Sequence, residues 1–221
     1  MNMRPLLVVT AISVVAQLAL AGYALTQLPA GAQIAIHWGI DGRADGFADA
    51  WFGVLLLPAL TLLLGPLLAV IPRFDPRFEN LSRSASAYVW IVGSTILLLG
   101  AVQAFVVLSA LGWQLDVTTF LAIAVGVLFV IIGNFLGKTR SSWFLGIRTP
   151  WTLSSEQSWT RTHRTGGYLF ILSGVLSATT ALAFGAEAFF WVLMVSLLGS
   201  VAFLFVYSYF VWRDDPDRRT L

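Results

Sequence analysis

Long apolar runs constrain this chain more than any other feature of its sequence. A helix needs about 20 predominantly apolar residues to cross a hydrocarbon core of about 30 Å. Hydrophobic residues make up 58% of the 221 and charged residues only 11%, a balance far from that of soluble domains. The sequence therefore predicts an all-α integral membrane protein with six transmembrane helices, at residues 6–28, 51–71, 88–111, 117–136, 168–185 and 188–212.

Lysine and arginine predict the orientation of these helices. Of the 13 basic residues, 12 lie before the first run, after the last run, or in the second and fourth connections, and Arg43 lies on the opposite side. Basic residues accumulate on the cytoplasmic side of membrane proteins. We therefore expect both termini, and a long structured loop between the fourth and fifth helices, to lie in the cytoplasm. The first run is longer than the apolar part of a signal peptide, which favours an uncleaved helix.

Composition argues against several classes of function. The sequence has no cysteine, which excludes disulfides, thiolate metal sites and a cysteine nucleophile. A net charge of +2 does not indicate direct nucleic-acid binding, and no metal or cofactor site is predicted. None of the six runs contains Asp, Glu, Lys, Arg or His. This argues against proton- or ion-coupled transport, because charged residues within a membrane mark ion paths.

The first connection, residues 29–50, carries one candidate site. His37 and the carboxylates Asp41 and Asp45 lie among glycines in a segment that the orientation places outside the cell. Imidazole and carboxylate groups bind cations or other ligands. The alternative interpretation is a turn-rich loop whose Asp residues cap turns and whose Trp38 lies at the membrane interface.

The second candidate site is the polar segment 134–167, which is too long and too rich in aromatic residues for an ordinary loop. A short amphipathic helix is predicted over residues 155–164, with Ser154 and Gln157 at capping-box spacing and the Gly166–Gly167 pair at its end. Such a helix is suited to an anionic membrane surface. The candidate residues of the segment are Asn134, Lys138, Arg140, Arg148, Thr149, Trp151, Glu156, Trp159 and His163.

Residue chemistry predicts individual roles in this segment. Glu156, Trp159, Thr160 and His163 are spaced by three or four residues and are expected on one face of the helix. Arg148 is expected to hold the loop against carbonyls or a carboxylate, because guanidinium presents its donors in a planar fork. Asn134 is expected to be buried and to satisfy backbone groups of the loop.

Catalysis and transport remain open alternatives. A membrane enzyme would use Glu156, His163, Arg148 and Lys138 around a lipid or peptide headgroup. Glu156 and His163 do not have the spacing of a zinc-protease helix, and His37 is predicted at the opposite membrane face from His163. A metal-dependent hydrolase that used both histidines would therefore require a different topology. A small-molecule carrier is also permitted by six spans with kink-prone prolines and glycines.

The second candidate site resembles a known family. The pattern N-x-x-G-K-x-[RK]-x-x-W-x-x-G-I-R-T-P-W-T-L, followed by W-x-x-T-H-x-x-G, is similar to the SdpI family of immunity proteins and is matched by Asn134, Gly137, Lys138, Arg140, Trp143, Gly146, Ile147, Arg148, Thr149, Pro150, Trp151, Thr152, Leu153, Trp159, Thr162, His163 and Gly166. The first connection is similar to a membrane domain of unknown function often fused to that family, through Pro29, Ile36, His37, Trp38, Gly42, Asp45 and Gly46. The resemblance implies a two-helix domain over residues 1–80 and a four-helix domain over residues 81–221.

The resemblance also implies a function. Members are bacterial plasma-membrane proteins that protect their cell against a secreted, membrane-active peptide toxin. The founding member is taken to signal as well, by holding a DNA-binding repressor at the membrane. On this basis the first connection, with His37, Trp38, Asp41 and Asp45, is expected to face the toxin. The segment 134–167 is expected to sense or relay in the cytoplasm.

Overall fold

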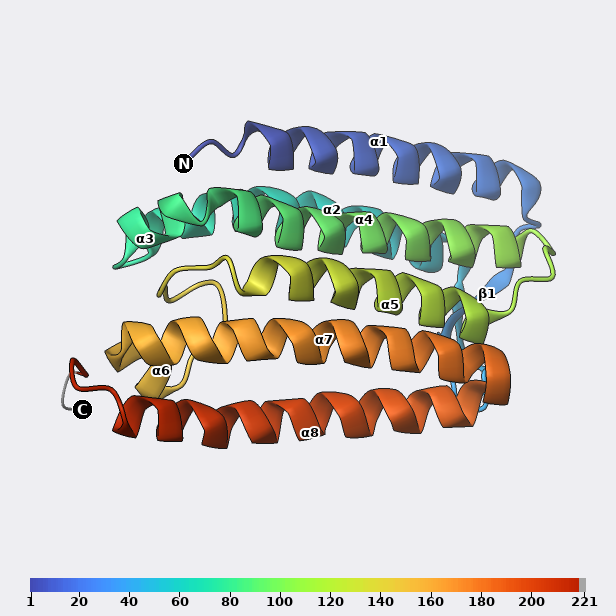
Figure 1. Cartoon of the computed structure of the whole chain (residues 1–221). Coiled ribbons are helices and arrows are strands. Elements are labelled where there is room, and N and C mark those ends of the chain that lie inside the picture. Colours follow the sequence, from blue (N-terminus) through green and yellow to red (C-terminus); the bar gives the residue numbers. More distant parts are fainter. Residues whose placement is uncertain (219–221) are drawn as a thin grey trace.

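The structure, a computed structural model, describes residues 1–218. Its six long helices are α1 (Arg4–Gln27), α2 (Ala50–Val70), α4 (Ala85–Ala110), α5 (Val117–Leu136), α7 (Glu156–Phe184) and α8 (Ala186–Arg213). Each is long and apolar enough to cross a membrane, which confirms the six predicted spans. The helices lie side by side with their axes roughly parallel, in one elongated bundle (Figure 1).

Shorter elements lie at the two ends of the bundle (Figure 1). One end carries η1 (Ile71–Phe74), α3 (Phe78–Arg83), α6 (Pro150–Ser154) and the start of the chain; we call it the motif end. The other end carries the strands β1 (Gln33–Trp38) and β2 (Ala44–Asp49), which pair antiparallel; we call it the hairpin end. The hairpin is the departure from the predicted all-α class, because a glycine-rich connection has folded into a strand pair.

The six helices form two groups of three. α1, α2 and α4 pack on one another, α7 packs along both α5 and α8, and the two groups meet chiefly where α4 lies against α5. We call them the N-terminal group and the C-terminal group. The expected domain division between residues 80 and 81 stays a prediction, and α4 packs with the two helices that precede it.

Polar side chains of α4 compensate for prolines in the N-terminal group. Pro58 has no N–H and leaves the carbonyl of Val54 without its helical donor. Gln103 Nε2 donates to that oxygen at 2.9 Å. Pro72 frees the carbonyl four residues earlier in the same way, and Tyr88 Oη donates to it at 2.5 Å. These contacts satisfy backbone groups that are costly to leave bare inside a membrane, so the polar residues have a structural explanation.

Glycines allow α5 and α7 to approach each other closely in the C-terminal group. A Cβ on Gly133 would overlap the carbonyl oxygen of Gly167, and a Cβ on Gly174 would lie 2.8 Å from the carbonyl oxygen of Gly126. Close backbone contact through small residues is typical of membrane helices. The prediction that the Gly166–Gly167 pair ends a short helix is therefore wrong. The pair lies inside α7, which continues to Phe184, because close packing against α5 outweighs the weak helix propensity of glycine.

Candidate functional site

The two ends of the bundle carry opposite charge. The hairpin end has five carboxylates and one guanidinium, namely Asp41, Asp45, Asp49, Asp116, Glu187 and Arg43. All six residues are exposed. Hydrogen bonds from Thr119 lower the pKa of Asp116, so this carboxylate is charged at neutral pH. The remaining basic residues of the described chain belong to segments at the motif end. The hairpin end therefore carries net negative charge and the motif end net positive charge.

The hairpin is anchored on the N-terminal group by apolar contacts. Ile34 is buried and packs so closely on Gly53 of α2 that a Cβ there would lie 2.5 Å from Ile34 Cδ1. Trp38 meets Phe105 of α4 edge to face at 5.5 Å between ring centroids, and Phe105 stacks on Phe120 of α5 at 4.6 Å. The predicted ligand-facing Trp38 thus fixes the hairpin, through an aromatic row that continues into the C-terminal group.

The tip of the hairpin reaches across to the C-terminal group. Gly42 has a φ of 77°, which favours glycine, and its N–H donates to the carbonyl of Gly39 at 2.9 Å. A Cβ on Gly42 would lie 2.8 Å from Thr118 Oγ1 on α5 and 3.5 Å from Ala186 Cβ on α8. The tip therefore rests on the first turns of two helices that are distant from it in sequence.

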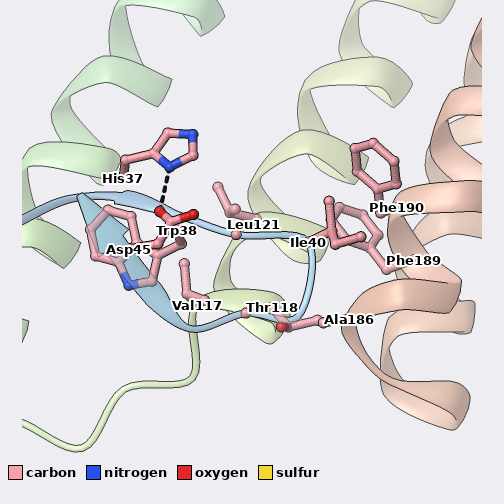
Figure 2. A pocket seen from close by; sticks show the side chains of 12 residues that line it. His37, Trp38, Ile40, Asp45, Val117, Thr118, Leu121, Ala186, Phe189 and Phe190 are labelled. Atoms are coloured by element: carbon pink, nitrogen blue, oxygen red, sulfur yellow. Dashed lines mark hydrogen bonds and ion pairs between the residues drawn. The ribbon is translucent and has the colours of Figure 1, made fainter.

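A cavity of about 410 Å³ opens between the hairpin and these helices. Figure 2 shows Ile40 close to Phe189 and Phe190, and His37 bonded to Asp45 on the other side of the cavity. The His37 Nδ1 to Asp45 Oδ1 distance is 2.5 Å. Of the four residues predicted to face a ligand, His37, Trp38 and Asp45 line the cavity. The fourth, Asp41, accepts from the backbone N–H of Arg43 at 3.1 Å, as the turn-capping alternative predicts.

At the motif end, the loop that follows α5 crosses back to the N-terminal group. The buried carboxylate of Asp75 accepts three backbone N–H bonds, from Arg77 at 2.7 Å, Trp143 at 2.9 Å and Phe144 at 3.2 Å. Beside these bonds Leu145 is buried in the apolar core of α1, α2 and α4. The loop is therefore held to the other group by both a buried charge and an apolar side chain.

Further hydrogen bonds along α3 and the start of α4 complete this contact. The Arg77 guanidinium donates to Ser141 Oγ and to the carbonyl of Leu153, the latter at 2.7 Å. Asn80 Nδ2 donates to the carbonyl of Ser141 at 3.0 Å. Ser84 Oγ accepts the backbone N–H of Arg140 at 2.8 Å. The backbone of the loop is thus satisfied largely by side chains of the N-terminal group.

The centre of the motif end is a buried pair of rings. Trp159 and His163 are both 0% exposed and stack at 3.9 Å between centroids. His163 Nε2 accepts the backbone N–H of Ile147 at 2.7 Å, and Nδ1 lies 2.7 Å from the carbonyl of Trp159. A ring that accepts through Nε2 and donates through Nδ1 is neutral. His163 is therefore a packing residue that fixes the loop to α7.

The prediction of a surface helix at residues 155–164 is wrong. That stretch forms the first turns of α7, in which Trp159 and His163 are buried while Glu156 is exposed. Residues spaced by three or four along a helix lie near the same side, but their burial can still differ. The loop covers the side of α7 that carries the two rings, whereas Glu156 and Thr160 remain exposed. Burial of Trp159 leaves no aromatic anchor here for a membrane surface.

The helix caps also differ from those predicted. Thr149 and Thr152 form the capping box, which begins α6. Ser155, rather than Ser154, caps α7 by accepting the N–H of Ser158 at 2.8 Å. Thr149 Oγ1 also lies 3.0 Å from Ser208 Oγ on α8. The caps therefore start two helices and tie one of them to α8.

The start of α6 and the N-cap of α7 both contact the C-terminal region. Trp151 packs edge to face against Phe205 and Tyr209 of α8, at 4.8 and 5.2 Å between centroids. Ser155 Oγ donates to the buried Asp215 Oδ2 at 2.5 Å. Trp151 is thus a packing residue, and the segment that directly follows α8 is held to the motif through Asp215.

The remaining predicted motif residues are exposed, namely Asn134, Lys138, Arg140, Arg148 and Glu156. Arg148 Nη1 donates to the carbonyl of Trp143 at 2.5 Å, the type of contact expected of it. The expectation that Asn134 is buried is wrong. Side chains of the N-terminal group satisfy the loop instead, and Asn134 is exposed on the last turn of α5. Glu156, Arg148 and Lys138 do not converge on the buried His163, so the set proposed for an enzyme is not assembled.

Sequence reasoning missed Asp75, Arg77, Asn80 and Asp215. Their signal is weak, because each lies in a short polar segment of unremarkable composition and meets its partners through the tertiary fold. The walls of the hairpin-end cavity were missed for a related reason. Val117, Phe189 and Phe190 belong to apolar helix ends, which the sequence assigns to membrane spans.

Two separate parts of the chain match known families. Residues 138–208 match the SdpI/YfhL protein family, and residues 12–62 match a domain of unknown function, DUF1648. The last third of this membrane protein is therefore similar to the SdpI/YfhL family. The SdpI match begins where α5 ends and runs through the motif end into α8, and the DUF1648 match contains the hairpin.

One curated protein that the chain resembles is Immunity protein SdpI of Bacillus subtilis (strain 168). It is 26% identical over 106 residues, which cover 48% of this chain and 51% of that protein. The match therefore spans about half the length of the relative. No solved structure matches the chain. The similarity to this family and the six apolar helices make the chain a multi-pass protein of the bacterial plasma membrane.

Proposed function

We propose that this protein protects a bacterial cell against a secreted, membrane-active peptide toxin. The observation that carries the proposal is the SdpI-family match over the motif end, residues 138–208, supported by a relative named as an immunity protein. Basic residues favour a cytoplasmic motif end with both termini inside. The hairpin end is then the surface that an external toxin meets first.

The structural use of the motif residues supports immunity over catalysis. Trp159, His163 and Thr149 are buried and satisfy or pack against parts of the fold. An acid–base catalyst needs a titratable group within reach of a substrate, and the buried His163 uses both ring nitrogens internally. A protein that binds a toxin needs no such group.

A cytoplasmic repressor protein is a second proposed partner, at the motif end. A polar cavity of about 520 Å³ lies there between α3, the start of α7 and residues 215–217, which follow α8. Its walls include Arg77, Asn80, Glu156 and Asp215. Mixed charges with hydrogen-bonding side chains suit a hydrophilic protein surface better than a lipid tail.

Survival of toxin-exposed cells tests the proposed function. The full chain is produced in a toxin-sensitive bacterium, which is then challenged with culture supernatant from a toxin-producing strain. We expect higher survival than in cells that make an unrelated six-helix membrane protein at the same membrane abundance. Equal survival of the two cultures, across supernatants from several producing strains, would contradict the proposal.

A further inference from the structure

We infer that the cavity beneath the hairpin is a docking site for a cationic amphipathic peptide, which inserts an apolar side chain between the two helix groups. This inference rests on the proposed function and specifies the kind of peptide that the hairpin end receives. It concerns a place in the fold that the motif residues do not reach.

The first step is the position of the cavity between the two groups. The hairpin of the N-terminal group forms one wall, and the first turns of α5 and α8 form the other. Gly42 is the point where the walls meet, at Thr118 and Ala186. A side chain inserted beside this glycine contacts both groups at once.

The second step is the chemistry of the walls. Val117, Leu121 and Phe189 provide an apolar surface at the helix ends, and Ile40 faces Phe189 and Phe190 from the hairpin (Figure 2). Ile40 is 51% exposed although it is a large aliphatic residue. A volume of about 410 Å³ falls within the range of about 300–1,000 Å³ of ligand pockets. An aromatic or branched aliphatic side chain suits such walls.

The third step is the charge around the cavity. Asp45 lines the cavity, Asp41 lies between the lining residues Ile40 and Gly42 in sequence, and Glu187 follows the lining residue Ala186 on the first turn of α8. Asp41 Oδ1 and Asp45 Oδ2 both lie close to Gly39, at 3.0 and 3.2 Å from the position of an added Cβ. Two carboxylates on one turn attract a lysine or arginine, and complementary charge also speeds association.

The same charge favours a peptide over a lipid. Anionic phospholipids accumulate where basic side chains gather, and the hairpin end has five carboxylates against the single guanidinium of Arg43. A cationic amphipathic peptide is complementary to both the carboxylates and the apolar cavity walls. Its basic side chains would lie over the carboxylates and one apolar side chain would enter the cavity. Such peptides also partition to membrane interfaces, the level at which these helix ends lie.

Binding of a synthetic peptide tests the inference directly. The probe is a fluorescein-labelled amphipathic helix of leucine and lysine, and its control is the same peptide with glutamate in place of lysine. The full-length protein is held in phosphatidylcholine nanodiscs and binding is followed by fluorescence anisotropy. We expect the lysine peptide to bind at least tenfold more tightly than to empty nanodiscs, and the glutamate peptide to show no such gain.

Two kinds of variant locate the binding. Ala186→Trp fills the cavity and is expected to weaken binding of the lysine peptide about tenfold, while Ala183→Trp, at an exposed position on α7, leaves it unchanged. The double variant Asp41→Asn with Glu187→Gln changes only exposed side chains and is expected to weaken binding and reduce its dependence on salt. Unchanged binding by both cavity and charge variants overturns the inference.

Other outcomes separate this inference from its premise. If a phospholipid copurifies with the wild type and is lost in Ala186→Trp, the cavity holds lipid and the inference is overturned. If cells with Ala186→Trp survive the toxin as well as the wild type, the result supports the proposed immunity function and contradicts docking of the peptide in the cavity. If the wild type binds the lysine peptide but does not increase the survival of toxin-exposed cells, the result supports peptide docking and contradicts the proposed function.

Discussion

The two ends of the bundle connect the same two helix groups in different ways. At the motif end, buried side chains such as Asp75 and His163 satisfy the backbone of the connecting loop. At the hairpin end, the contact is a glycine tip and a few apolar residues around an open cavity. A buried network of hydrogen bonds is costly to disturb, because each lost bond leaves a polar group without a partner in a low dielectric. The contrast indicates that the motif end fixes the arrangement of the groups, while the hairpin end has room for a ligand.

The largest effect is expected from Asp75→Ala at the motif end. The substitution leaves three backbone N–H groups without their buried, charged acceptor, which costs about 3 kcal/mol of stability. The loss of stability is measured as a decrease in the thermal unfolding midpoint of the detergent-solubilised protein. Asp214→Ala, an exposed carboxylate near the same end, is the matched control and should change little. Equal midpoints for the two variants would show that the motif-end network does not hold the loop.

The two histidines provide the next test of the comparison. His163→Phe keeps a buried ring but removes the acceptor for the Ile147 N–H, and we expect a loss of about 1–3 kcal/mol. His37→Phe alters a side chain that is 71% exposed and is expected to stay within about 0.5 kcal/mol of the wild type. Chemical denaturation of both variants in the same detergent checks this. A larger loss for His37→Phe would reverse the assignment of the fixed and open ends.

The sequence predicted the spans well because each is a continuous apolar run, and the helix of residues 117–136 has the predicted bounds. Sequence-based prediction was wrong about helix ends and burial at positions where tertiary contacts outweigh the local residue pattern. The Gly166–Gly167 pair was predicted to end a helix, yet these glycines form part of the surface of α7 on which α5 packs. Trp159 and His163 were predicted on one helical face, but the loop that buries them cannot be inferred from spacing. The hairpin cavity likewise depends on Phe189 and Val117, which are distant from His37 in sequence.

A smaller effect is expected within the N-terminal group. Gln103→Leu leaves the Val54 carbonyl, freed by Pro58, without its donor, and we expect a loss of about 1 kcal/mol. Pro58→Ala restores the helical donor. The double variant Gln103→Leu with Pro58→Ala should therefore lose less stability than the sum of the two single variants. Additive losses in this double-mutant cycle would mean that Gln103 does not compensate for the proline.

The smallest effect on stability is expected from Arg148→Lys. Arg148 is exposed, and its bond to the Trp143 carbonyl contributes no more than about 0.5 kcal/mol of stability at the surface. Protection against the toxin is nevertheless expected to fall, because lysine lacks the planar fork of donors. Survival assays at equal membrane abundance measure the effect. Undiminished protection by the variant would remove Arg148 from the relay proposed for the motif end.

Sided labelling of single cysteines tests the central claim, that the open end faces outward and the fixed end faces the cytoplasm. The natural chain has no cysteine, so Arg43→Cys and Thr160→Cys each introduce one reactive thiol, at exposed positions of opposite ends. Intact cells are treated with a membrane-impermeant thiol reagent, and permeabilised cells control for access. We predict labelling of position 43 alone in intact cells. Labelling of position 160 in intact cells would contradict the account, because the motif end would then face the toxin.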